Sequence, residues 1–316
     1  MDKDLKLFEL LSDGEFHSGE VIAKLFGVTR SRVWSLINSL EEKGVIVSRV
    51  RGKGYRYRGG SFLLDSNHIE QKLSPLALYY FPSITSTNDI AREYLKTSDQ
   101  PLLVVAEHQT GGRGRRGRQW ASCYAHNLLF TYGVPRFSAM QGLEGLSLLV
   151  GLTLVDVVNA SLGVDAKVKW PNDVLINGAK LAGVLVEIQG DIGGDYSLII
   201  GVGLNVNESP SVGDREVTSL MKNFGRAINR SELLVAFVDQ LRRNINLFCL
   251  EGFSSFSGRW NEMDAYRGCQ VQVEQGGEIL VGLSRGVNAN GVLDIEVEGE
   301  LRSVHGGEVS LRAVYE

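Results

Sequence analysis

An Asn-Gly dipeptide at residues 177–178 separates two apolar runs, and this short feature strongly constrains the fold of the central part of the chain. Asn-Gly readily adopts the positive φ angles of a type I′ turn, so the two runs are predicted to pair as an antiparallel hairpin. After a turn at residues 190–195, a further strand is expected from Ser197 to Asn205. Successive strands joined by short turns predict an antiparallel meander with helices covering one face.

Other apolar segments extend this central part. Further strands are predicted at residues 76–81, 102–106 and 128–132. The most apolar segment, residues 143–164, contains Glu144, Asp156 and Asn159, so we predict a buried helix there and not a membrane span. The chain has 316 residues, of which 43% are hydrophobic and 22% charged, and this composition predicts two or three globular domains.

The cysteines and the first residues indicate the compartment. Cys123, Cys249 and Cys269 are far apart and form no Cys-x-x-Cys pair, which predicts a reducing environment and neither a zinc site nor a disulfide framework. The charged start, Met1-Asp-Lys-Asp, lacks the apolar stretch of a signal peptide. We therefore expect a cytoplasmic protein with no membrane partner.

The first 60 residues predict a winged helix-turn-helix. Apolar residues recur at helical spacing in three short segments: one that ends near Gly14, one between Ser18 and Gly27, and one that begins at Thr29. A run at residues 45–50, a turn at residues 51–54 and an alternating Tyr-Arg-Tyr-Arg run then predict a β-hairpin with a basic tip. Two helices joined by a glycine-containing turn and followed by such a hairpin form the winged variant of the motif.

The charge of this segment indicates a nucleic-acid partner. Residues 1–60 contain 11 Lys and Arg against 8 Asp and Glu, whereas the whole chain has a net charge of -4. The N-terminal end of a recognition helix reaches base edges and a wing tip reaches phosphates. We predict that DNA is contacted by Thr29, Arg30, Ser31, Arg32, Ser35, Arg51 and Lys53. The alternative is a small helical domain whose solvated basic face binds a protein.

A loop with the sequence GGRGRRGRQW, residues 111–120, contains four arginines within six positions. Clustered positive charge repels itself, so the loop is expected to receive an anionic ligand. Its glycines match the dinucleotide-binding pattern G-x-G-x-x-G, which requires a helix to begin directly afterwards. The residues that follow Trp120 do not predict a helix, so a Rossmann domain is not favoured.

Two other features are candidates for the chemistry. The turn Ser86-Thr-Asn88 before a predicted helix offers hydroxyls, an amide and a helix N-terminus, which suit a small polar ring. Lys180 begins the strand that returns from the hairpin, where it can meet an anion while Asp173 balances its charge or holds a metal. The sequence shows no nucleophile motif and no Walker lysine, so catalysis by positioning and charge stabilisation is expected.

These features occur together in one order, and in that order they closely resemble the biotin protein ligase family. The motifs are Ser86-Thr-Asn88, Gln109, Gly112 to Arg118 with Trp120, Lys169-Trp-Pro-Asn-Asp173, Lys180-Leu-Ala-Gly183 and Gly203-Leu-Asn205. With a winged helix in front, the whole chain looks like the bifunctional members that also repress the biotin operon. The resemblance implies an α+β protein with a winged helix (residues 1–63), a mixed α/β catalytic domain with a class II synthetase-like antiparallel sheet (64–268) and an SH3-like barrel (269–316).

The resemblance also implies roles for individual residues. Biotin would be bound by Ser86, Thr87, Asn88, Gln109, Arg113, Gly114, Arg115 and Lys180. ATP and the adenylate would be bound by Arg113, Arg115, Arg116, Trp120, Asn172, Asn205 and Arg312. Lys180, Arg115 and Asp173 would take part in catalysis, with Mg²⁺ on the ATP phosphates and Asp173 as its possible ligand. His126 stands where the family usually has a small residue, which affects the local pocket or a dimer surface.

The implied activity is ATP-dependent activation of biotin to biotinyl-5′-AMP and its transfer to a lysine of a biotin carboxyl carrier protein. Biotinyl-5′-AMP would also be the corepressor with which a homodimer binds operator DNA. Two alternatives remain at this point: a biotin-sensing transcription factor that does not ligate, and a lipoate-type ligase, against which the full arginine-glycine loop argues.

Overall fold

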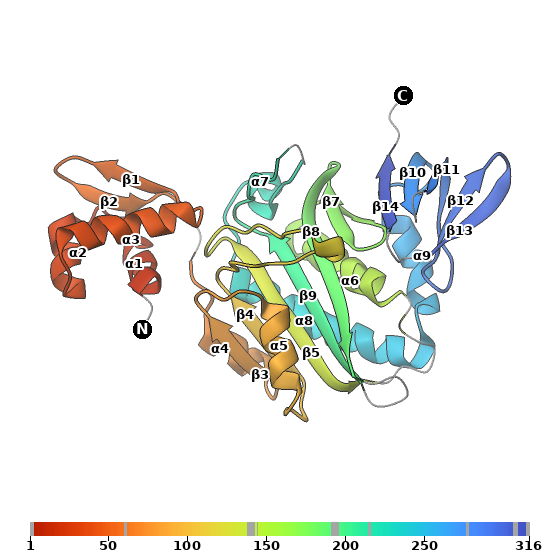
Figure 1. Ribbon diagram of the computed structural model, residues 1–316, viewed down its shortest axis with the longest axis horizontal. Helices are drawn as coiled ribbons and strands as arrows, with labels where there is room; N and C mark the ends of the chain where they lie inside the picture. Colours follow the sequence, from red (N-terminus) through yellow and green to blue (C-terminus); the bar gives the residue numbers. More distant parts are fainter. Residues whose placement is uncertain are drawn as a thin grey trace.

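The computed structural model describes residues 3–59, 62–137, 143, 145–190, 196–213, 216–275, 278–305 and 309–313. These residues form three separate sheets, of two, seven and five strands, in successive parts of the chain (Figure 1). Within them, no helix has the length and apolar character needed to cross a membrane.

The N-terminal part is the predicted winged helix. Its elements are α1 (Lys3–Leu11), α2 (Gly19–Phe26), α3 (Arg30–Glu42), β1 (Val47–Val50) and β2 (Gly54–Tyr57). Ser18 and Thr29 cap α2 and α3 by accepting hydrogen bonds from the backbone, as their positions in the sequence predict. Fully buried apolar side chains from all three helices, such as Phe8, Ile22 and Ile37, make the core of this domain.

The central domain is built on the seven-stranded sheet, in the order β3-β4-β5-β9-β8-β7-β6. Its strands are β3 (Ala77–Phe81), β4 (Leu102–Ala106), β5 (Asn127–Phe137), β6 (Ala166–Lys169), β7 (Asp173–Ile176), β8 (Ala179–Gln189) and β9 (Tyr196–Asn205). Asn177 and Gly178 have φ angles of 51° and 80° and join β7 to β8, so the predicted hairpin is confirmed. The predicted antiparallel sheet is mixed, because α5 (Thr87–Leu95) connects β3 to a parallel β4.

Helices cover both faces of this sheet, so the prediction that they cover one face is wrong. Alternate residues of β4 point to opposite sides, so that Leu103 and Val105 join the core under α6 (Leu146–Leu162) and α8 (Arg230–Glu251), while Leu102 and Val104 pack against α5. The short α4 (Ser66–Leu73) packs beside α8. The apolar segment predicted to be a buried helix is α6, and most of its side chains are buried.

After α7 (Leu220–Phe224), α8 and α9 (Ser254–Met263), the chain enters the five-stranded sheet. Its strands are β10 (Gln270–Gln275), β11 (Glu278–Val287), β12 (Leu293–Val297), β13 (Glu300–Val304) and β14 (Val309–Ala313), all antiparallel in the order β13-β12-β11-β10-β14. The all-β C-terminal module is thus confirmed, and its closure into an SH3-like barrel remains a prediction.

The winged helix is docked on the central domain by buried contacts. Tyr124 packs edge-on against Phe8 with ring centroids 5.6 Å apart, and its backbone N–H donates to the carbonyl of Lys43 at 2.8 Å. His126, the residue that departs from the family pattern, is 3% exposed and lies 2.7 Å from the hydroxyl of Tyr57. Its bulk therefore serves the junction between the two domains and is not part of the pocket described below.

A candidate biotin and ATP pocket

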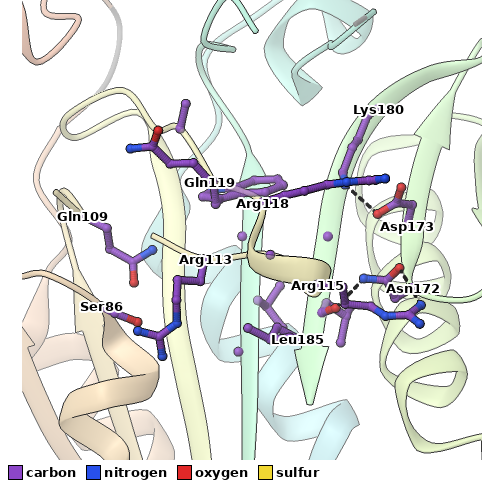
Figure 2. A pocket seen from close by; sticks show the side chains of 18 of the residues that line it. Ser86, Gln109, Arg113, Arg115, Arg118, Gln119, Asn172, Asp173, Lys180 and Leu185 are labelled. Carbon is purple, nitrogen blue, oxygen red and sulfur yellow. Dashed lines mark hydrogen bonds and ion pairs between the residues drawn. The ribbon is translucent and has the colours of Figure 1, made fainter. Parts of the chain in front are cut away.

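One pocket collects nearly all of the residues predicted to bind biotin and ATP or to take part in catalysis. It lies over β8 and β9, between the start of α5 and the arginine-glycine loop, which contains a 3₁₀ turn at Arg115–Gly117 (Figure 2). Twelve of the predicted ligand-binding and catalytic residues line it: Ser86, Thr87, Asn88, Gln109, Arg113, Gly114, Arg115, Trp120, Asn172, Asp173, Lys180 and Asn205. The structure thus brings together residues that are more than 100 positions apart in the sequence.

The first end of the pocket is polar and formed by the N-terminus of α5. The side-chain oxygen of Gln109 accepts hydrogen bonds from the backbone N–H and the hydroxyl of Thr87, at 2.7 and 3.0 Å. The Asn88 carbonyl oxygen accepts from Thr131, and the Asn88 amide donates to Glu187 at 2.6 Å. These bonds fix the amide orientations before any ligand arrives. Thr131 and Glu187 were not among the predicted residues.

The floor of the pocket depends on glycine. A Cβ atom on Gly203 of β9 would overlap the ring of Trp120, and one on Gly201 would overlap the Asn88 side chain. A Cβ on Gly183 of β8 would lie 3.1 Å from the same tryptophan ring. The motifs that contain Gly183 and Gly203 are therefore needed for close packing: they let the indole lie directly on the sheet.

The second end of the pocket carries the positive charge. Lys180 and Asp173 face each other across the β7–β8 hairpin, with Nζ and a carboxylate oxygen 2.6 Å apart, as predicted from the sequence. The Lys180 ammonium also lies 5.4 Å from the centre of the Trp120 ring. Arg115 reaches towards this end and donates to the side chain of Asn172 at 3.4 Å, and burial lowers the pKa of its guanidinium. Arginine remains protonated in proteins, so the group stays cationic.

Asparagines connect the pocket to the winged-helix junction. The Asn205 side chain lines the pocket and accepts a hydrogen bond from Asn127 at 3.2 Å. Asn127 in turn accepts from the backbone N–H of Cys123 at 2.5 Å, in the turn that precedes β5 and carries Tyr124 and His126. The residues from the pocket to the domain junction are thus linked through buried polar contacts. This connection was not predicted from the sequence.

Two predicted nucleotide-binding residues are not among those that line the pocket. Arg116 has a φ of 60° within the loop and is absent from the lining. Arg312 belongs to β14, where its backbone pairs with Gln272, but its side chain lies outside the described part of the structure. Arg118, Gln119 and Leu185 line the pocket without having been predicted. Arg118 could have been predicted from the clustering of arginines in the loop.

The predicted DNA-contacting residues belong to two parts of the winged helix, the start of α3 and the turn between β1 and β2. Thr29 caps α3 and accepts from the backbone of Arg32 at 3.2 Å, and Arg30, Ser31 and Arg32 are exposed in its first turn. Ser35 is half-buried one turn further on, where its hydroxyl accepts from Arg32 at 3.4 Å. In the turn between β1 and β2, Arg51 and Lys53 are exposed.

A winged helix joined to a mixed-sheet domain with an arginine-rich loop over a polar pocket defines a ligase of the biotin and lipoate class. The chain belongs to the biotin protein ligase family. The Biotin/lipoate A/B protein ligase family model matches residues 80–205, an HTH domain model matches residues 3–56, and the Biotin protein ligase C terminal domain model matches residues 268–312.

Several proteins of known identity are similar along their whole length. The chain is 34% identical to the bifunctional ligase/repressor BirA of Salmonella typhimurium, covering 98% of this chain and 97% of that protein. It is 30% identical to the protein of the same name from Bacillus subtilis, covering 96% and 97%. A solved biotin protein ligase from Aquifex aeolicus in complex with biotin and ATP superimposes with a TM-score of 0.66 and 28% identity, covering 75% of this chain and 99% of that one.

Proposed function

We propose that this protein is a biotin protein ligase that also represses transcription of biotin genes. The observation that carries the proposal is the division of one pocket into a polar end of hydroxyl and amide groups at the start of α5, where Arg113 is neutralised by Asp89, and a second end with the cations Lys180 and Arg115. Biotin has the same division, with a ureido ring at one end and a carboxylate at the other. The pocket and biotin are thus complementary in both polarity and charge.

At the polar end, Ser86, Thr87, Asn88 and Gln109 would bind the ureido ring. Hydroxyl and amide groups supply both donors and acceptors, which a urea group requires, and the N-terminus of α5 adds backbone N–H groups. Because Gln109 and Asn88 are already held by hydrogen bonds, little side-chain entropy is lost when the ring binds. Binding at this end orients the carboxylate towards the loop.

At the cationic end, the first reaction joins two anions. A carboxylate oxygen of biotin attacks the α-phosphorus of ATP, the bond to the β-phosphate oxygen breaks, and pyrophosphate leaves. Two unit charges 4 Å apart repel by about 1 kcal/mol in water and about 4 kcal/mol at an effective dielectric constant of 20. Lys180 and Arg115 would remove this repulsion and stabilise the charge that develops at phosphorus.

In the second reaction, the amine of an acceptor lysine attacks the acyl carbon, and AMP leaves. We propose a biotin carboxyl carrier protein as the acceptor. Trp120 would stack on the adenine, and Asn172 and Asn205 would hold the nucleotide, so that the mixed anhydride stays covered by the loop until the acceptor arrives. Arg116 and Arg312 remain candidates for phosphate contacts outside the pocket.

A magnesium ion is expected with the ATP phosphates. Asp173 is the one carboxylate among the described residues that line the pocket, and no group of three or more metal-binding side chains occurs in the described part of the chain. One carboxylate together with phosphate oxygens and waters is an ordinary environment for Mg²⁺. The ion would neutralise charge on the departing pyrophosphate.

For the repressor activity, we propose that α3 enters the major groove with Arg30, Ser31, Arg32 and Ser35, and that Arg51 and Lys53 of the wing contact phosphates. We further propose that biotinyl-5′-AMP acts as the corepressor by favouring a homodimer that binds paired half-sites of the operator. We also propose that the protein acts in the cytoplasm, where it would meet both ATP and operator DNA. As domain boundaries we propose residues 1–63, 64–268 and 269–316.

The deciding experiment follows labelled biotin into a biotin carboxyl carrier domain in the presence of ATP and Mg²⁺. We expect the wild type to label the acceptor and Lys180→Ala to lower the rate of adenylate formation about 10²- to 10³-fold, the usual cost of removing one charge-stabilising group. Biotin binding without any labelling by the wild type would instead establish a DNA-binding sensor. Preferential transfer of lipoate would establish a lipoate-type ligase.

A further inference from the structure

The side chains of Arg113 and Arg115 leave the arginine-glycine loop in different directions. Figure 2 shows Arg113 beside Ser86 at the polar end of the pocket and Arg115 beside Asn172 at the other end. Both terminal nitrogens of Arg113 donate to Asp89 in the first turn of α5, at 2.7 and 2.6 Å. This is a bidentate pair, the strongest geometry available to an arginine and a carboxylate.

The carboxylate of Asp89 is itself fixed from the other side. Arg92, one turn further along α5, donates to it at 2.7 Å and also pairs with Glu187 of β8 at 2.9 Å. Glu187 accepts from the amide of Asn88 at 2.6 Å. The Asp89 carboxylate is therefore held in position by the helix and the sheet, and the loop alone has to be ordered when the pair forms.

From this geometry we propose that Asp89 is a positioning residue that anchors the loop, and that the Arg113 guanidinium binds Asp89 and not the ligand. The inference rests on the proposed function. Asp89 neutralises the Arg113 guanidinium and holds it at the polar end of the pocket, so the anionic part of the ligand would be bound by Lys180 and Arg115 at the other end. The network also joins the loop to Asn88, so the groups that receive the biotin ring and the loop that covers it share one set of contacts.

The electrostatics agree with an anchor. The Arg113 guanidinium, with help from Arg92, lowers the pKa of the Asp89 carboxyl, and the Asp89 carboxylate raises the pKa of Arg113. Both side chains remain partly exposed, with exposed fractions of 36% and 40%. A partly exposed pair is weak enough to open when the acceptor protein has to enter and strong enough to bias the loop towards the closed position.

The first test uses the full chain without ligand. Trypsin cleavage after the loop arginines reports how often the loop opens. We expect Asp89→Asn and Arg113→Gln each to accelerate this cleavage about threefold to tenfold. The matched control is Asp99→Asn, which breaks an exposed ion pair with Arg136 elsewhere on the surface and should leave the rate unchanged. Equal cleavage rates for wild type and Asp89→Asn would overturn the anchor.

The second test measures the reaction. Asp89→Asn should release biotinyl-5′-AMP about threefold to tenfold faster and raise the KM for biotin by a similar factor, with little change in the kcat of adenylate formation. Asp89→Glu should restore part of the loss. Arg113→Gln should match Asp89→Asn, and the double variant should be no worse than either. An Arg113→Gln variant that lowers kcat while Asp89→Asn does not would show that Arg113 binds the ligand directly, against the proposal.

The two proposals can fail separately. If the wild type forms no biotinyl-5′-AMP, the proposed function fails, while the cleavage rates still decide whether Asp89 anchors the loop. If the wild type is active and the cleavage rates of Asp89→Asn and wild type agree, the anchor fails and the ligase function stands.

Discussion

The hydroxyl of Tyr57 donates a hydrogen bond to Nε2 of His126 across the boundary between the winged helix and the central domain, over 2.7 Å. The direction follows from the other ring nitrogen: Nδ1 lies 2.6 Å from the carbonyl of Tyr124, which can only accept. Nδ1 therefore carries the proton in the neutral ring, and Nε2 is the acceptor. Both side chains are at least 95% buried, so the two domains meet through a bond shielded from water.

Removing this bond should loosen the domain junction. Tyr57→Phe leaves Nε2 of His126 buried without a donor, which costs about 1–3 kcal/mol. We expect a lower melting temperature, with the winged helix unfolding before the ligase domains in a calorimetric scan. Tyr79→Phe alters a half-buried tyrosine of β3 outside the junction and serves as the control. Identical scans for Tyr57→Phe and wild type would show that the bond does not hold the domains together.

Acid should weaken the same junction. Burial lowers the pKa of His126 below its ordinary value of 6.5, so the unfolded chain takes up this proton first as the pH falls. The unfolded state then binds more protons, and the free energy of unfolding decreases as the pH drops below about 6.5. Above that pH both states are neutral and the contribution disappears.

The pH effect is measured as a difference between variants. Other groups titrate in the same pH range. Burial also lowers the pKa of His108. Burial raises the pKa of Asp264 to about 6, and this group makes the free energy of unfolding increase as the pH falls, opposite to the effect of His126. We therefore compare the change in unfolding free energy between pH 7.5 and pH 5.5 in the wild type and in His126→Asn. The variant should lose less stability on acidification. An unchanged difference would assign the acid sensitivity to other groups.

A buried ion pair should be the most sensitive point of the central domain. Glu107 and Arg230 are 0% and 2% exposed and lie 2.7 Å apart, and Glu107 also accepts from the backbone of Leu64 and the hydroxyl of Tyr80. Glu107→Gln removes one charge and leaves the other buried, which costs about 3–5 kcal/mol. Denaturant unfolding measures this loss. Asp156→Asn, which breaks a surface pair with Arg259, should change stability by less than about 1 kcal/mol.

The tryptophan of the pocket can be displaced without altering any polar group. Gly203→Ala introduces a methyl group that overlaps the ring of Trp120. We expect weaker ATP binding and an altered fluorescence of Trp120, with biotin binding at the α5 end nearly unchanged. Isothermal titration with each ligand separates the two effects. Gly178→Ala offers a comparison: no atom of the described residues lies within 4 Å of the added methyl group, so we expect any effect there to come from backbone strain at a φ of 80°. Equal losses of affinity for both ligands in Gly203→Ala would mean that the variant disturbs the whole sheet.

Much of this arrangement could be predicted from the sequence because it depends on local signals. The caps at Ser18 and Thr29, the Asn177-Gly178 turn and the apolar run of α6 each fix a structure within a few residues. The polar turn at residues 86–88 and the arginine-glycine loop can be identified from their local composition. The assignment of biotin and ATP to them came from the resemblance to a family.

The remaining features depend on contacts between distant segments. The parallel pairing of β3 with β4 is decided by how α5 packs on the sheet, and neither strand signals its direction. Glu107 looks in the sequence like any charged residue after a strand, and only the fold brings it to Arg230, 123 positions away. His126 departs from the family pattern in the sequence, but its partner Tyr57 lies 69 positions earlier in another domain. Such pairs have no periodicity from which they could be predicted.

The docked position of the winged helix has a consequence for the DNA that a dimer of this protein would bind. A recognition helix on a loose tether can reach half-sites at many separations, whereas one seated on its neighbour through Tyr57, Tyr124 and His126 has a set direction. Two such helices would bind only half-sites that lie on the same side of the duplex, separated by whole turns of about 34 Å. Five added base pairs would turn one half-site to the opposite side of the duplex, out of reach of its helix. The packing of the junction between the two domains would thus determine which spacing of half-sites in the operator the dimer can bind.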